Sequence, residues 1–213
     1  MSSDEDHDDF DTELDLLRRY EQMIETQIET INGIDDKAAN TGRLIGILSG
    51  LLLTAASIAV STNAIEFTEA TVGAFLMLGI GIVALFSSLV FAIITYLSSK
   101  FVYGPPSGLG EYMATYRIDT QEYRDALLRG YSTGISANRR VVEENSKRFK
   151  WCLTTLLVAL LFLFGAGMLL VLPENHILDG VVLVVFTATA LLLARYIIRE
   201  EYLTLENEHP GNE

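Results

Sequence analysis

Cysteine and histidine are scarce in this 213-residue chain, and their scarcity excludes several kinds of site. A single cysteine, Cys152, rules out an intramolecular disulfide and lacks the spacing of a metal-binding motif. The three histidines, His7, His176 and His209, have no cysteine or carboxylate partners at metal-ligand spacing. A phosphate-cradling glycine loop and a nucleophile elbow are also missing. We therefore expect no catalytic residues, no metal site and no cofactor, and we predict that the chain is not an enzyme.

Charged side chains are nearly absent from four long apolar stretches. A helix that rises about 1.5 Å per residue needs roughly 20 apolar residues to cross about 30 Å of hydrocarbon. Lipid offers no partner for unpaired backbone groups, so such stretches must be helical unless they close into a barrel, and none alternates like a barrel strand. The sequence predicts an all-α, multi-pass membrane protein with two transmembrane hairpins, 44–98 and 151–198. The four predicted spans are 44–65, 70–98, 151–172 and 177–198.

Lysine and arginine are missing from the two short connections inside these hairpins. Of the 15 basic residues, residues 1–43 contain four, residues 99–150 contain nine, and the end of the chain from Arg195 onward contains two. Basic residues close to membrane spans are retained in the cytoplasm. The pattern predicts a cell-membrane protein whose two termini and central segment are cytoplasmic.

Acidic residues outnumber basic residues by 28 to 15, which gives a net charge of −13. They gather at the ends: 13 lie in residues 1–43 and five lie from Glu200 onward. Surplus carboxylate keeps proteins hydrated in high salt, so we expect a halophilic source, and it repels phosphate, so we expect no nucleic-acid partner. We predict a disordered acidic tail at 1–11 and an acidic cytoplasmic tail at 199–213.

Two helices are predicted on the cytoplasmic side of the spans. The first lies in residues 12–43 and either packs on cytoplasmic helices of its own chain or pairs between subunits. Its apolar stripe is an imperfect heptad, because Glu21 and Asp35 interrupt it. The second follows a Pro- and Gly-rich loop in residues 99–150 and begins near Thr120, capped by Asp119 or Thr120. Together they predict a small cytoplasmic helical bundle, into which the second and third spans can extend. The stripe of the first helix consists of Leu14, Leu17, Ile24, Ile28, Ile31 and Ala38.

Glycines and polar residues mark other positions of interest. Gly130 and Gly134 are points at which the second cytoplasmic helix could break. Asp35, Asp36 and Lys37 lie at the centre of a polar segment before the first span, which we predict to be a hinge. The first span then carries one face of small residues at four-residue intervals, which would let two membrane helices approach closely. That face consists of Gly42, Gly46 and Gly50.

Cations before the third span offer a candidate ligand site. Arg139 and Arg140, with Lys147 and Arg148 two turns further on, could bind a phosphate group. Tyr116, Tyr123 or Tyr131 could stack on a base. The alternative is an ordinary basic cluster that lipid phosphates and neighbouring glutamates neutralise.

Three short runs carry a resemblance. They are Ile34-Asp35-Asp36-Lys37-Ala38-Ala39 ahead of the first span, Tyr131-Ser-Thr-Gly-Ile135-Ser-Ala-Asn138-Arg139, and Lys147-Arg148 leading into the third span. With this placement the chain resembles the transmembrane effectors of Pycsar, a prokaryotic antiphage defence system, over most of residues 20–197. Small effectors with the two-span architecture called SLATT share the general layout.

The resemblance implies a function and a ligand. In Pycsar a pyrimidine cyclase makes cyclic CMP or cyclic UMP on infection, and the effector impairs the membrane so that the cell stops growing or dies. The chain departs from common nucleotide receptors because it has no recognisable cyclic-nucleotide-binding β-barrel, so the ligand would bind the helical bundle. Shifting an effector from about 1% to about 99% active takes roughly 5.5 kcal/mol of differential affinity, which favours several ligands on a homo-oligomer. The alternatives are a structural or assembly membrane protein that docks a cytoplasmic partner, and a small channel or exporter.

Overall fold

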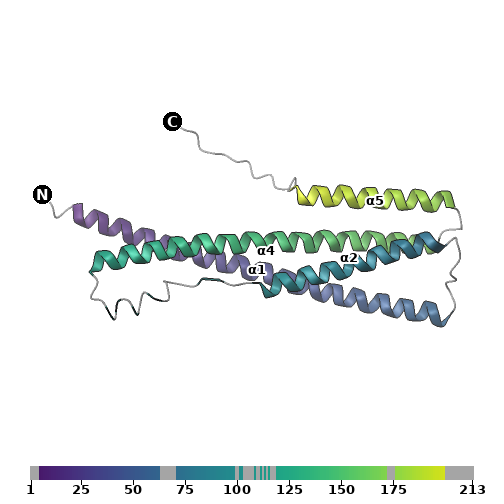
Figure 1. Ribbon diagram of the computed structural model, residues 1–213, viewed down its shortest axis with the longest axis horizontal. Helices are drawn as coiled ribbons and strands as arrows, with labels where there is room; N and C mark the ends of the chain where they lie inside the picture. Colours follow the sequence, from purple (N-terminus) through teal and green to yellow (C-terminus); the bar gives the residue numbers. More distant parts are fainter. Residues whose placement is uncertain are drawn as a thin grey trace, which may run out of the picture. The chain divides into compact units, whose positions relative to one another are not determined.

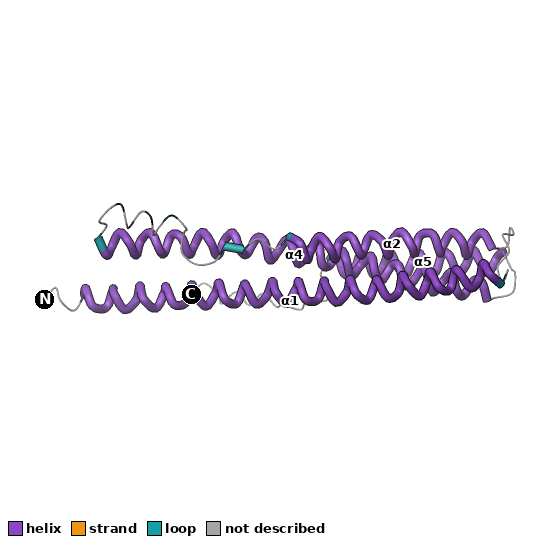
Figure 2. Tube along the Cα trace, turned by 90° about the horizontal axis from the view of Figure 1, so that it is seen from below, coloured by secondary structure: helices purple, strands orange, loops and turns teal. Residues whose placement is uncertain are grey.

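In a computed structural model the chain forms long helices (Figure 1). The structure describes residues 5–62, 71–98, 101–102, 108, 111, 113, 115, 119–171 and 176–199. Helix covers nearly all of these residues, and none of them is in a strand (Figure 2). The all-α prediction is therefore confirmed. The long helices are α1 (Glu5–Ser61), α2 (Val72–Leu97), α4 (Thr120–Val171) and α5 (His176–Ile198).

Each of these four helices is long and apolar enough to span a membrane, as predicted. The boundaries differ slightly from the predicted ones, since α1 ends at Ser61 and α2 begins at Val72. The connections at residues 63–70 and 172–175, and residues 200–213 of the acidic tail, lie outside the described residues.

Helix α1 is longer than the sequence pattern predicted. It begins at Glu5, within the tail predicted at 1–11, and residues 1–4 of that tail lie outside the described residues. Carboxylates are favoured at the N-terminal end of a helix by its dipole, and the first residues of α1 are mostly acidic. The polar segment at Asp35, Asp36 and Lys37 contains no helix break. Its action as a hinge stays a prediction.

Helix α4 is also continuous. Its start at Thr120 confirms the predicted boundary, because Asp119 accepts a hydrogen bond from the Gln121 amide through its side chain and from the Tyr123 amide through its carbonyl. The helix runs through Gly130 and Gly134 without interruption, so the breaks expected there do not occur. The third predicted span is thus the C-terminal part of a helix that begins about thirty residues earlier.

Burial follows a seven-residue period along both long helices. This spacing corresponds to 3.5 residues per turn and is the pattern of coiled-coil packing. These buried residues form a line along each helix. The line keeps its seven-residue spacing from the polar half of the helix into the apolar half. On α1 the buried residues at this spacing are Ile24, Ile31, Ala38 and Ile45. On α4 they are Tyr131, Asn138, Asn145, Cys152, Ala159 and Ala166.

The chain divides into two compact units. Unit 1 contains residues 1–37 and 95–147, and unit 2 contains residues 38–94 and 148–213. The divisions fall inside α1 and inside α4, so each of these helices contributes to both units. One division lies between Lys37 and Ala38, at the end of the predicted hinge.

Unit 2 holds two apolar clusters formed around α4. In one, Ile45 of α1 and Leu85 of α2 pack with Leu156 and Ala159 of α4. In the other, α2 and α4 pack with α5. Its buried members are Met77, Phe162, Ala166, Val182 and Ala190.

Close approach of α2 and α4 depends on Gly81. A Cβ atom at this position would lie 2.9 Å from Cγ and 3.2 Å from the backbone nitrogen of Leu163. Reciprocal hydrogen bonds join the same helices, because the Ser88 hydroxyl donates to the Cys152 carbonyl (2.8 Å) and the Cys152 thiol donates to the Ser88 carbonyl (3.3 Å). Small residues and satisfied polar groups of this kind hold membrane helices together.

Candidate functional site

Buried polar side chains at seven-residue intervals form the centre of unit 1. Tyr131, Asn138 and Asn145 occupy successive positions of the buried line on α4, two helical turns apart, where apolar residues would ordinarily stand. A buried amide without partners costs free energy, so each must be matched by specific groups on neighbouring segments. In a coiled coil, polar residues at such positions fix the register of the helices.

Asn138 holds the chain just beyond α2. Its Oδ1 accepts a hydrogen bond from the Val102 amide at 3.0 Å, and its Nδ2 donates to the Val102 carbonyl at 3.1 Å. The side chain thus satisfies both backbone groups of one residue, as a neighbouring strand would. Two turns further along α4, Asn145 Oδ1 accepts a hydrogen bond of 2.7 Å from the Ser98 hydroxyl.

Tyr131 joins α4 to α1. Its hydroxyl donates to Glu21 Oε1 at 3.3 Å. Burial, and next the negative charge of Glu21, raise the pKa of Tyr131 above its ordinary value. Glu21 interrupts the apolar stripe of α1, and this contact gives the interruption a structural role.

Gln27 makes the second polar contact between the two helices in unit 1. Its Nε2 donates to the Ile135 carbonyl at 3.2 Å, while its Oε1 is buried with no hydrogen-bond partner in the described part of the chain. An unmatched buried acceptor weakens the contact that contains it. Gln27 and Tyr131 thus give α1 and α4 two specific polar contacts in unit 1.

The predicted ligand residues do not converge on one point. Arg139 and Arg140 are exposed, whereas Tyr131 is buried against α1. Lys147 is exposed and pairs with Glu143 at 2.7 Å, and this ion pair lowers the pKa of Glu143. Arg148 lies in unit 2. Arg140 and Lys147, seven residues apart, share one side of α4.

A shallow groove in unit 1 escaped the sequence analysis. It has a volume of about 340 Å³ and follows a run of small residues on α4, with one cation at its edge. Ala126, Gly130 and Gly134 recur at four-residue intervals, and this spacing is the signal in the sequence that indicates the groove. The lining residues are Val102, Ala126, Arg129, Gly130, Thr133, Gly134 and Ala137.

Only part of the predicted glycine face on α1 lies close to another helix of the same chain. A Cβ at Gly42 would lie 4.0 Å from the Ala92 Cβ of α2, and nothing lies within 4 Å of such an atom at Gly46 or Gly50. Their role in helix packing stays a prediction.

Among the described residues no three potential metal ligands come together. No protein-family model, no curated protein and no solved structure matches the chain.

Proposed function

We propose that this protein is a signal-gated membrane effector of antiphage defence. A cyclic pyrimidine nucleotide, cyclic CMP or cyclic UMP, made by a neighbouring cyclase would bind its cytoplasmic part, and the protein would then impair the membrane and cause abortive infection. The nature of the signal rests on the resemblance to the Pycsar effectors. The structural support is that α1 and α4 are single helices with a polar half in unit 1 and an apolar half of membrane-spanning length in unit 2.

Continuity of these helices supplies a route from signal to membrane. A ligand shifts an equilibrium only by its difference in affinity for two states. In unit 1 the contacts between the two helices include Glu21–Tyr131 and Gln27–Ile135. A hydrogen bond between neutral groups contributes about 0.5–1.5 kcal/mol, and one to a charged carboxylate contributes about 1.5–3 kcal/mol. Contacts of that size are within reach of one bound anion per subunit, and several subunits together would give a sharp response. The proposed active form is accordingly a homo-oligomer.

The exposed cations of unit 1 are the proposed ligand contacts. Arg139 and Arg140 present guanidinium groups that can bind a phosphate, and Arg129 lies at the edge of the groove on the same helix. The protein would act without catalysis, since binding and helix rearrangement suffice for gating.

A second candidate function is docking of a partner as a structural or assembly protein of the membrane. The groove at Gly130 and Gly134 favours it, because small residues along one helix face let another helix approach closely. In that case the protein would act constitutively and would need no nucleotide.

Co-expression with a pyrimidine cyclase distinguishes the two candidates. We expect depolarisation, measured with a potential-sensitive dye, and growth arrest with an active cyclase but not with a catalytically dead one. The double variant Arg139→Gln/Arg140→Gln should blunt both effects. Arg18→Gln/Arg19→Gln is the matched control, because it removes the same charge from exposed positions of unit 1 and should leave the response intact. Identical behaviour with active and dead cyclase would favour the constitutive docking protein.

A further inference from the structure

Helices α2 and α4 form an antiparallel pair whose facing residues repeat every seven positions. Ser88 and Cys152 lie opposite each other, because each donates a hydrogen bond to the other's carbonyl, at 2.8 and 3.3 Å. Steps of seven residues from this level, taken in opposite directions along the two helices, reach small buried residues. Side chains this small let helix backbones approach closely. The residues reached are Gly81 opposite Ala159, and Ala74 opposite Ala166.

The hydrogen bonds at Ser88 select this register among those that the small residues allow. A shift of α4 by seven residues would bring Gly81 opposite Ala166, which is equally small. The same shift would bring Ser88, which is fully buried, opposite Ala159. A buried polar group that loses its partner costs about 1–3 kcal/mol. The polar level therefore holds the two helices at one setting, as buried polar residues do in coiled coils.

Interlocking side chains keep the same two helices from sliding. Leu163 of α4 fills the space beside Gly81, and Met77 of α2 fills the space beside Gly165. Met77 is fully buried. Movement of one helix along the other would press these side chains into the facing helix or leave cavities behind, and both cost free energy. The α2–α4 pair is accordingly a rigid part of unit 2.

The apolar half of α1 is held mainly near its start. Ile45 is fully buried and packs on Leu85, but beyond it no residue of α1 up to Thr62 is buried. Helix α5 is also largely exposed, yet two buried residues on different turns, Val182 and Ala190, hold it in place. The hydroxyl groups in the last part of α1 donate to carbonyls of α1 itself. They belong to Ser49, Thr54 and Ser61.

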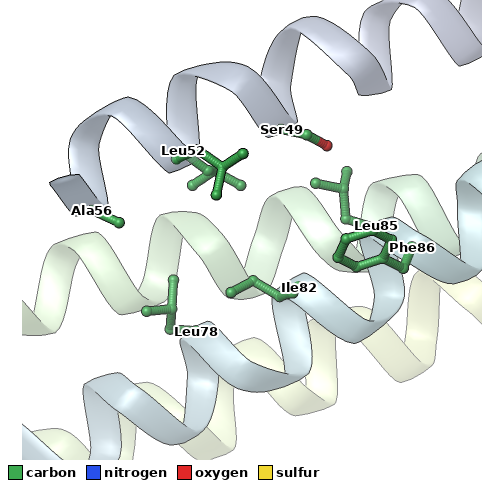
Figure 3. A pocket seen from close by; sticks show the side chains of 8 residues that line it. Ser49, Leu52, Ala56, Leu78, Ile82, Leu85 and Phe86 are labelled. Atoms are coloured by element: carbon green, nitrogen blue, oxygen red, sulfur yellow. The ribbon is translucent and has the colours of Figure 1, made fainter.

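An open gap separates α1 from α2 beyond this contact. Figure 3 shows Leu52 and Ala56 of α1 across the gap from Leu78 and Ile82 of α2. Only 6% of the most apolar window of α1 is buried, against 28% for α2 and 39% for α4. The last part of α1 therefore lacks the interlocking that joins α2 to α4.

We propose that residues 46–61 of α1 form an arm that moves against the rigid α2–α4 pair, with the contact at Ile45 as its pivot. Few buried contacts mark the segments of a protein that open at low free energy. The α1 arm is about 24 Å long at about 1.5 Å per residue, so a tilt of about 10° displaces its end by about 4 Å. The arm gives the proposed effector a moving part in the membrane, and its motion needs no nucleotide.

Distances between spin labels in lipid nanodiscs test the proposal. The full-length protein carries Cys152→Ser, which keeps a hydrogen-bond donor there, and is diluted with unlabelled protein so that only distances within one chain are measured. Phe164→Cys on α4 is labelled together with Leu76→Cys on α2, with Leu44→Cys before the pivot, or with Val60→Cys near the end of the arm, all at exposed positions. We expect narrow distance distributions for the first two pairs and a distribution broader by about 4 Å for the third.

Truncation of the pivot should act on the arm alone. Ile45→Ala removes the buried side chain, so the Val60→Cys distribution should broaden further while the Leu76→Cys distribution stays narrow. Ile47→Ala is the matched control, because Ile47 is exposed. An unchanged Val60→Cys distribution in Ile45→Ala would contradict a pivot at this residue.

Loss of the polar level should act on the pair alone. Ser88→Ala should broaden the distribution between Leu76→Cys and Phe164→Cys, whereas Ser87→Ala should not, because the Ser87 hydroxyl donates to the Val83 carbonyl of its own helix.

The three distributions decide the proposal without any of these variants, even if a variant loses the circular dichroism signal of its helices. A Val60→Cys distribution as narrow as that of Leu76→Cys would overturn the proposal. Equally broad distributions would also overturn it, since α2 and α4 would then not be a rigid pair. Because no nucleotide is present, such a failure would leave the proposed function to the cyclase experiment.

Discussion

Buried polar residues are the positions at which single substitutions should matter most in unit 1. Asn138 is fully buried and satisfies both backbone groups of Val102. The same residue appears in the sequence as an ordinary polar member of a helix. Its importance comes from a contact with a residue 36 positions away, which no local pattern predicts.

Asn138→Leu should release the segment that follows α2. The substitution removes both hydrogen bonds and leaves the Val102 backbone unmatched, at a cost of about 1–3 kcal/mol. Hydrogen exchange measured by mass spectrometry should show faster exchange in the peptide containing Val102, by one to two orders of magnitude. Asn40→Leu, at an exposed position of α1, is the control and should leave that peptide unchanged. Unchanged exchange in Asn138→Leu would exclude this contact.

Because Tyr131 is buried beside Glu21, we expect the protein to lose stability at alkaline pH. Its folded-state pKa is raised, first by burial and then by Glu21 and Tyr123, so the folded state favours the protonated phenol. That contribution is complete below the ordinary tyrosine pKa of about 10 and is lost as the pH rises through the raised value. The wild type should therefore lose thermal stability above about pH 10 more steeply than Tyr131→Phe, measured by circular dichroism in detergent. Parallel pH profiles for the two proteins would contradict this assignment.

At the scale of elements, α2 and α4 approach closely because Gly81 has no side chain. Gly81→Ala should destabilise the protein, since overpacking against the Leu163 backbone typically costs about 1–3 kcal/mol. Gly79→Ala on the same helix is a matched control, because a Cβ there meets nothing within 4 Å and both changes favour helix equally. Unfolding by sodium dodecyl sulfate in mixed micelles should separate the two variants. Equal midpoints would show that the close approach at Gly81 does not contribute to stability.

The helices and the start of α4 were predictable from the sequence, whereas the contacts between helices and the continuity of the two long helices were not. Long apolar runs and the cap at Asp119 are local signals, and the structure confirms both. The continuity of α1 through Asp35 and of α4 through Gly130 was missed, because polar residues and glycines count locally as breaks. Tertiary packing at seven-residue intervals overrides that preference.

The candidate site was less predictable than the helices. Charge alone singled out Arg139 and Arg140, and these residues are exposed as a ligand contact requires. Tyr131 was predicted to stack on a base beside them, whereas its position on the buried line turns it toward Glu21. The buried face of α4 is determined by the segments that pack against it. In unit 1 this face carries polar residues, so no apolar stripe in the sequence identifies it as buried.

At the scale of the whole molecule, every functional claim depends on membrane topology. The gating proposal needs the polar halves of α1 and α4 in the cytoplasm, and the proposed motion of the α1 arm needs the apolar half of α1 in the bilayer. The distribution of lysine and arginine predicts this arrangement, and the four apolar helices are consistent with it. Asn138 would be a poor probe of topology because it is fully buried, whereas Ser136 on the same helix is exposed.

The most direct test is labelling of single cysteines in intact cells with a membrane-impermeant maleimide, in a Cys152→Ala background. We predict that Asn63→Cys and Asn175→Cys react from outside, and that Ser136→Cys and a cysteine at Ser2 react only after the cells are lysed. Protection of Asn175→Cys in intact cells together with labelling of Ser136→Cys would contradict the four-span arrangement and the functional account that depends on it.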